Sequence, residues 1–255
     1  MRWLILTTHD DRCESYFTAA GHEVRYYESL AALPEVVDVV YFRDPFNAGQ
    51  YNMTAIGQTM QQVCERYPDA YYVDGCMTID DALIEDKWRQ YSQLARFMPA
   101  TQLATDVSES QEKVIIKERI SSRARGISFA LTDIPPARRD AYIVQPLLDI
   151  IEEYRVYTVR GRVAPYMTQK SPKTADSKVK VIGAMPTDDA MKQYVEAIVR
   201  HVPREYDLLG FDIARTTDGL TLIELNRSPQ FKRYNELTGT NILETTITAI
   251  EEKQA

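Results

Sequence analysis

The sequence has few of the residues that mark fibrous, membrane-spanning or disulfide-linked proteins. Ten glycines and twelve prolines in 255 residues exclude a collagen-like or low-complexity chain. The apolar runs are only a few residues long, far below the ~20 needed to cross a bilayer, and the N-terminus lacks the apolar core of a signal peptide. The three cysteines, Cys13, Cys64 and Cys76, lack metal-site spacing. We therefore expect free thiols and a cytoplasmic location.

The sequence also lacks the excess of basic charge that is typical of nucleic-acid-binding proteins. Its 37 acidic and 30 basic residues give a net charge of −7. This balance argues against a general nucleic-acid binder, although it leaves room for a local basic site. The apolar content of 44% and charged content of 26% are those of a globular protein, long enough for one large domain or two or three lobes.

The first 85 residues alternate strand and helix patterns. The continuous apolar run "RWLILTT" is typical of a strand buried on both faces. Further strands are predicted over residues 22–28 and 36–44. Helices are predicted from Asp10 or Asp11 to Ala20, and over residues 55–67. Strands separated by helices predict a small parallel α/β layer.

The rest of the chain is dominated by strand patterns. Strands are predicted over residues 112–120, 127–134, 141–148, 153–170, 178–185, 208–216 and 220–226. One or two helices are predicted over residues 78–97, with Thr78 or Asp80 as the cap, and one helix each over 187–202, capped by Thr187, and over 241–253. We expect an α/β (α+β) chain in three parts: an N-terminal parallel α/β lobe (1–85), a small central strand lobe (86–143) and a C-terminal antiparallel α+β lobe (144–255).

Acidic and amide side chains lie in the last two predicted strands, "LLGFDIART" and "LTLIELN", which "TDG" joins as a turn. If these strands pair, Asp212 and Glu224 can point to one face. Strand alternation then puts Asn226 on that same face. Two carboxylates and an amide oxygen are the hard ligands that Mg²⁺ prefers. The alternative is a solvated strand face, but the three residues together favour a metal site.

Basic residues elsewhere are candidates for binding phosphate. Lys117 ends the apolar run "VIIK" before the loop "ERISSRARG", which is not a Walker motif. The lysine can neutralise phosphate there, or the loop can be an ordinary exposed hairpin. Arg155 lies in mid-strand, either at a surface or reaching toward the acidic residues. The segment 160–180 is either a solvated loop or a cover over phosphate and substrate; its basic residues are Arg160, Arg162, Lys170, Lys173, Lys178 and Lys180.

In this order, Asp86-Lys87 at a helix start, "VIIK", "VQPLL", "EYRVYTVRGR" and "GFDI…DG…IELNRSPQF" resemble the ATP-grasp superfamily. The resemblance is greatest to the branch of ribosomal-protein glutamate ligases and peptide-forming carboxylate–amine ligases. It covers nearly the whole chain, and "IELNRSPQF" is its most specific element. The resemblance implies the ATP-grasp fold, and ATP with Mg²⁺ or Mn²⁺ as cofactors.

The resemblance also implies roles for individual residues. Residues that match catalytic positions are Arg155, Arg227 and Lys117. Residues that match nucleotide-binding positions are Lys87, Lys117, Gln145, Pro146, Leu147, Leu148 and Glu153. Residues that match metal ligands are Asp212, Glu224 and Asn226. Within these sets, residues 145–148 match the hinge whose backbone meets adenine, and Arg227 matches a position at the acyl-phosphate or substrate site.

The implied function is an ATP- and Mg²⁺-dependent ligase that activates a carboxylate as an acyl phosphate and joins it to an amine. Its partners are ATP and a small-molecule or peptide carboxylate with an amine, with no membrane; homodimers are common in the superfamily. The loop "ERISSRARGIS" carries Arg123 and Arg125 where the family is richer in glycine, which keeps an RNA ligase as an alternative. A third alternative is a non-catalytic nucleotide-binding or partner-binding protein.

Overall fold

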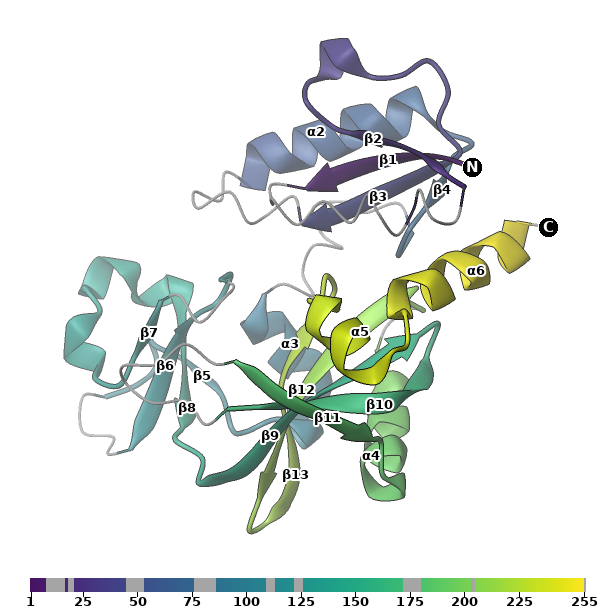
Figure 1. Ribbon diagram of the computed structural model, residues 1–255. Helices are drawn as coiled ribbons and strands as arrows, with labels where there is room; N and C mark the ends of the chain where they lie inside the picture. The colour runs from purple at the N-terminus through teal and green to yellow at the C-terminus, as the bar shows by residue number, and fades with distance from the viewer. Residues whose placement is uncertain are drawn as a thin grey trace.

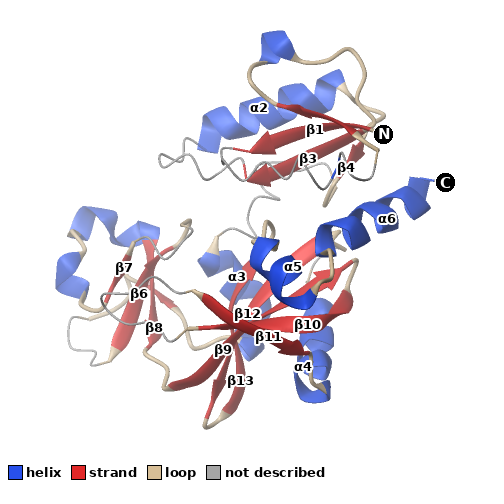
Figure 2. Cartoon of the chain, viewed as in Figure 1, coloured by secondary structure: helices blue, strands red, loops and turns tan. Residues whose placement is uncertain are grey.

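The computed structural model of the chain describes residues 1–7, 17, 21–44, 53–75, 86–108, 113–121, 126–171, 180–202 and 205–254. These residues form three β-sheets (Figure 1), whose strands and helices Figure 2 distinguishes by colour. No helix among them is both long and apolar enough to span a membrane. The mixture of one parallel and two antiparallel sheets confirms the predicted α/β (α+β) class.

The N-terminal sheet is parallel, with the strand order β2-β1-β3-β4. Its elements are β1 (Arg2–Thr7), β2 (Glu23–Tyr26), β3 (Val39–Asp44), β4 (Tyr71–Tyr72) and the helix α2 (Met53–Arg66). Successive residues of β1 point to opposite faces, and both faces are covered. Leu4 and Leu6 pack with Met60 of α2, whereas Trp3 and Ile5 join a second core. Of the predicted helix from Asp10 or Asp11 to Ala20, only Phe17 belongs to the described residues, and it is helical.

The second sheet is small and antiparallel, with the order β5-β8-β6-β7. Its strands are β5 (Gln102–Leu103), β6 (Val114–Glu118), β7 (Ile127–Ser128) and β8 (Tyr142–Pro146). The predicted strand over residues 127–134 is wrong beyond Ser128. The Ser128 hydroxyl accepts from the Ala130 amide and donates to the Asp133 carboxylate, 2.5 Å away, so the chain turns into a short 3₁₀ helix, Leu131–Asp133.

The third sheet is antiparallel and carries the candidate site. It has the order β11-β10-β9-β12-β13, made of β9 (Ile150–Val159), β10 (Arg162–Lys170), β11 (Val181–Pro186), β12 (Leu208–Thr216) and β13 (Gly219–Asn226). Residues such as Val156, Phe211 and Leu225 face a core shared with α3 (Lys87–Leu94) and α4 (Asp189–Val199). The opposite face carries the polar residues of the site.

That opposite face is covered at one end by the N-terminal sheet and the last two helices, α5 (Lys232–Thr238) and α6 (Ile242–Gln254) (Figure 1). Trp3 and Tyr41 from the N-terminal sheet, Tyr157 and Leu208 from the third sheet, and Ile247 from α6 belong to one buried core. This core fixes the N-terminal sheet against the sheet that carries the site.

One helix start differs from the sequence prediction, and the start predicted at Asp86-Lys87 is confirmed. α4 is capped by Asp188 and not by Thr187: the Asp188 carboxylate accepts from the Met191 amide at 2.8 Å, while the Thr187 hydroxyl donates to Ala164 O. α3 is capped by Asp86; Thr78 and Asp80 lie outside the described residues. The three-part division at residues 85 and 143 stays a prediction, and β8 pairs within the small sheet on both sides of the second boundary.

Candidate active site

The register of the third sheet brings Arg155, Asp212 and Glu224 into one row. Arg155 of β9 lies opposite Asp212 of β12, which lies opposite Glu224 of β13. Directly opposite residues of an antiparallel pair point to the same face. Asn226, two residues beyond Glu224, is on that face too. The sheet therefore gathers the three residues that the sequence suggested as metal ligands.

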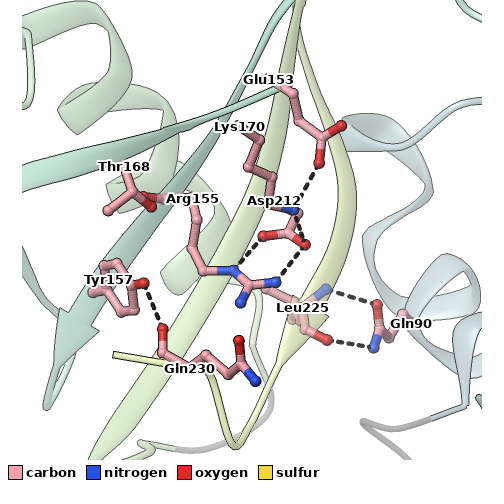
Figure 3. A network of polar contacts seen from close by, with 9 residues as sticks. All are labelled: Gln90, Glu153, Arg155, Tyr157, Thr168, Lys170, Asp212, Leu225 and Gln230. Atoms are coloured by element: carbon pink, nitrogen blue, oxygen red, sulfur yellow. Dashed lines mark hydrogen bonds and ion pairs between the residues drawn. The ribbon is translucent and has the colours of Figure 1, made fainter. Parts of the chain in front are cut away.

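Arg155 and Asp212 form a bidentate ion pair inside this row (Figure 3). Arg155 Nε lies 2.6 Å from Asp212 Oδ1, and Nη2 lies 2.8 Å from Oδ2. Asp212 is only 4% exposed. Burial alone would raise the pKa of this carboxyl, but Arg155 and Lys170 outweigh burial and hold it well below its usual range. Likewise, burial would lower the pKa of Arg155, but Asp212 raises it, so the pair is fully charged.

Lys170 joins this pair from the end of β10. Its Nζ lies 2.6 Å from Asp212 Oδ2 and 2.6 Å from Glu153 Oε1, between two carboxylates (Figure 3). In sequence, Lys170 belongs to a basic segment that is either a solvated loop or a cover over phosphate and substrate. The structure buries most of its side chain, and that of Glu153, in the polar face of the sheet.

Lys87 approaches the same row from the first residue of α3. Its Nζ donates to Ser121 O at 2.9 Å and lies 4.0 Å from Glu224 Oε2. The helix start is fixed by Asp86, whose carboxylate caps Trp88 N at 2.9 Å and pairs with Arg119 at 2.6 Å. Lys87 thus links the loop after β6 to the row on the third sheet.

Gln90, which the sequence analysis did not identify, holds the edge strand β13. Its side-chain amide donates to Leu225 O at 3.0 Å and its oxygen accepts from Leu225 N at 2.9 Å (Figure 3). The side chain therefore satisfies the edge groups of β13 as a neighbouring strand would, between Glu224 and Asn226. Only its burial in the folded chain distinguishes Gln90 from an ordinary helix-surface glutamine.

Arg227 is brought to the N-terminal sheet, not to an open surface. Its side chain is fully buried, with Nη1 3.6 Å from Asp74 Oδ2, and it donates to Arg43 O at 3.5 Å. Burial raises the pKa of Asp74 to about 6, although Arg227 opposes the shift. Asp74 also accepts from the Asp207 amide at 2.8 Å, just before β12. Arg227 thus ties the end of β13 to the N-terminal sheet.

Gly210 allows the chain after Arg227 to fold back over the sheet. It lies opposite both Asn226 and Tyr157, and a Cβ added there would come 2.6 Å from Pro229 Cβ. The Tyr157 hydroxyl donates to Gln230 O at 2.7 Å (Figure 3). This close approach fixes the segment that follows the metal-ligand candidate Asn226.

The remaining predicted nucleotide-binding residues lie on the second sheet or directly after its strand β8. Lys117 lies on β6 between Ile127 and Ile143 of the neighbouring strands. Gln145 is buried and donates to Thr101 Oγ1 at 2.8 Å, so its side chain serves the fold. Beyond it, Pro146 and Leu147 are exposed, Leu148 is half-buried, and the Leu147 amide donates to Lys113 O at 2.7 Å. These positions agree with a connection between two sheets.

Asp212, Glu224 and Asn226 fit a Mg²⁺ site by their donor chemistry. All three offer hard oxygens on one face. The Asn226 Nδ2 is buried and has no hydrogen-bond partner in the described part of the chain, so it is available to an acceptor such as a phosphate oxygen, while Oδ1 would be the metal ligand. No cluster of three or more His, Cys, Asp or Glu side chains suited to a metal occurs among the described residues. The three candidates therefore comprise two carboxylates and one amide oxygen.

Comparisons with known proteins identify the fold. No protein-family model and no curated protein matches the sequence. Solved structures do match. The ATP-grasp ligase PsnB complexed with a minimal precursor has a TM-score of 0.68 and 18% identity, covering 97% of each chain. D-cycloserine synthetase DcsG has a TM-score of 0.72 and 14% identity, covering 99% of each chain.

A RimK-domain ATP-grasp protein from Sphaerobacter thermophilus gives a similar result. Its TM-score is 0.64 at 15% identity, and the match covers 96% of this chain and 98% of that one. Matches of this extent include all three sheets, and at such identities they define the fold. Over almost its whole length, the chain has the ATP-grasp fold, as its sequence motifs predicted.

Proposed function

We propose that this protein is an ATP- and Mg²⁺-dependent ligase that activates a carboxylate as an acyl phosphate and joins it to an amine. The observation that carries the proposal is the strand register that puts Arg155, Asp212, Glu224 and Asn226 on one polar face of an ATP-grasp fold. Solved neighbours support nucleotide and metal binding: PsnB is described with a precursor variant, Mg and ADP at a TM-score of 0.70.

The proposed reaction has two steps. A carboxylate oxygen of the substrate bonds to the γ-phosphorus of ATP, the bond from that phosphorus to the β,γ-bridging oxygen breaks, and ADP leaves. An amine nitrogen then bonds to the acyl carbon, phosphate leaves, and the nitrogen loses a proton. Mg²⁺, when bound, neutralises phosphate charge.

The residues of this chain would position the reactants rather than exchange protons with them. Asp212, Glu224 and Asn226 would hold the metal. Arg155 already has its guanidinium fixed by Asp212 at 2.6 and 2.8 Å, so it presents a positive charge in a set direction. Lys87, anchored on Ser121, would meet phosphates beside Glu224. We further propose Lys117 and the backbone of residues 145–148 as nucleotide contacts from the second sheet.

The substrate class is a carboxylate-bearing peptide or small molecule. Among the neighbours, PsnB is described with the precursor peptide PsnA2 and AMPPNP, and DcsG as a D-cycloserine synthetase. These names differ in substrate size, so both classes belong in a test. An RNA substrate gains no support: Lys170 pairs with Asp212 and Glu153, and Arg233 pairs with Glu236. Arg123, Arg125 and Lys173 lie outside the described residues.

The test is ADP formation from ATP and Mg²⁺ across a panel of carboxylates, amines and acidic peptides. Glu224→Ala and Asn226→Ala should each abolish ADP formation while unfolding at the wild-type temperature. Asp218→Ala, in the exposed turn of the same hairpin, is the matched control and should keep full activity. ADP with Mg²⁺ should also raise the unfolding temperature of the wild type. Full turnover in both site variants contradicts the metal assignment, and no thermal shift at millimolar nucleotide contradicts the proposed function.

A further inference from the structure

The polar face of the third sheet is already balanced in charge. Three carboxylates, those of Glu153, Asp212 and Glu224, meet three cationic side chains, those of Arg155, Lys170 and Lys87. Adding a divalent cation alone would leave a net charge of two in a mostly buried site. Adding the cation with a nucleotide polyphosphate would bring the compensating negative charge. The balance therefore favours joint entry.

Both carboxylate oxygens of Asp212 are bound by cationic side chains of the protein. Oδ1 is taken by Arg155 Nε at 2.6 Å, and Oδ2 by Arg155 Nη2 at 2.8 Å and Lys170 Nζ at 2.6 Å. Lys170 Nζ also reaches Glu153 Oε1 at 2.6 Å. The ammonium group thus lies between two carboxylates and meets oxygen ligands, as a bound metal ion would. Mg²⁺ demands a regular shell of oxygen ligands, and these contacts compete for the same carboxylate.

We propose that Lys170 is a positioning residue that stands in for the divalent cation at Asp212 until nucleotide enters. Nucleotide phosphates supply Lys170 with another anionic partner and release Asp212 to the metal. The cation consequently binds with the nucleotide and not before it. This inference rests on the proposed function, because it assumes that Asp212 is a metal ligand.

The test is Mn²⁺ binding, read by electron paramagnetic resonance of the free ion and by calorimetry, with and without ADP. Wild-type protein should bind Mn²⁺ at least about tenfold more tightly with ADP than alone. The variant Glu153→Gln/Lys170→Met removes one charge of each sign, so it leaves no unpaired carboxylate from this pair. It should bind Mn²⁺ without ADP at least about tenfold more tightly than wild type, because the ammonium that competes with the metal for Asp212 Oδ2 is gone.

A matched control tests whether the effect is local. Glu196→Gln/Lys192→Met makes the same two changes on α4, which packs on the opposite face of the sheet. It should bind Mn²⁺ as wild type does. Thermal unfolding verifies that the site variant folds, and neutral replacement of a buried ion pair is usually tolerated. If the Glu153→Gln/Lys170→Met protein does not fold, Mn²⁺ binding by the single variant Lys170→Gln gives the same readout.

The outcomes separate the inference from the proposed function. Equal Mn²⁺ affinity with and without ADP in wild type, or no gain in nucleotide-free affinity in the site variant, overturns the inference while nucleotide binding stands. Failure of wild type to bind ADP under any condition overturns the proposed function, and the inference with it.

Discussion

Arg155 and Asp212 lie directly opposite each other on neighbouring strands and form a two-point ion pair, with N–O distances of 2.6 and 2.8 Å. The pair is mostly buried, with side-chain exposures of 17% and 6%. A buried ion pair is important for stability, because removing one partner leaves the charge of the other buried and unpaired. The pair therefore serves both the sheet and the site.

Arg155→Met should destabilise the protein by roughly 3–5 kcal/mol, because Lys170 is then the one cationic partner of Asp212 among the described residues. Urea unfolding measures this change. Arg155→Lys should recover part of the stability but not the two-point geometry. The matched control is Arg2→Met, which removes an equally bidentate pair with Asp38 at the surface. It should change stability little, and an equal loss in both variants would contradict the role given to burial.

Asp74 predicts an unusual dependence of stability on pH. Burial raises its pKa to about 6 from an ordinary 3.8. Folding therefore favours the protonated carboxyl: this contribution is complete below about pH 4 and is lost as pH rises through about 6. The loss amounts to about 3 kcal/mol, from two pKa units. Urea unfolding of wild type and Asp74→Asn between pH 4 and 8 isolates it, because the wild type should lose stability relative to the variant.

Asp38 is a control of opposite sign for that experiment. A hydrogen bond from Arg2 holds the pKa of Asp38 below its ordinary value. Its contribution is present above about pH 4 and is lost as pH falls. Wild type should therefore gain stability relative to Asp38→Asn only as pH rises toward about 4, and the difference between them should stay constant from pH 4 to 8. If the stability difference between wild type and variant follows the same pH dependence for Asp74→Asn and Asp38→Asn, Asp74 does not titrate with the raised pKa that its burial predicts.

The sequence was sufficient to predict the row of acids but not what surrounds it. Alternation in "LLGFDIART" and "LTLIELN", with a turn between, predicts that Asp212, Glu224 and Asn226 share a face, and the strand register agrees. This inference needs only local pattern. Gln90 meets Leu225 across 135 positions in the chain. Asp74 meets Arg227 only because the N-terminal sheet packs on the third sheet.

Two sequence predictions were wrong at positions where neighbouring residues favour competing local structures. Thr187 and Asp188 are both good capping residues, and in the fold the Thr187 hydroxyl donates to Ala164 O while the Asp188 carboxylate caps α4. The alternating pattern of residues 127–134 suits a strand, but the Ser128–Asp133 hydrogen bond turns the chain. Arg227 follows the metal-ligand candidate in sequence, and its assignment to the acyl-phosphate site stays a prediction. Its burial against Asp74 makes a positioning role the simpler expectation.

Asp86 connects helix capping to the nucleotide side of the site. Asp86→Ala removes the cap on Trp88 N and the ion pair with Arg119, so it should cost about 2 kcal/mol and loosen Lys87. Thermal unfolding and ADP affinity measure the two effects. Asp188→Ala removes the corresponding cap of α4 and also an ion pair, with Arg215. It should lower stability but leave ADP affinity unchanged; weaker ADP binding in both would argue against a local effect through Lys87.

Replacing Gly210 by alanine should disturb the packing on Pro229 and, through it, the binding of ADP with Mg²⁺. In Gly210→Ala the new Cβ meets Pro229 Cβ at 2.6 Å, so the segment after Arg227 must shift. Overpacking of this kind costs typically 1–3 kcal/mol, and it acts on the residue opposite Asn226. Unfolding in urea and the affinity for ADP with Mg²⁺ should both be impaired. Gly183→Ala, on β11 of the same sheet, meets nothing nearer than Gln169 Oε1 at 3.9 Å and should be harmless. If Gly210→Ala proves as harmless as Gly183→Ala, the close approach at Pro229 does not position the metal-ligand strand.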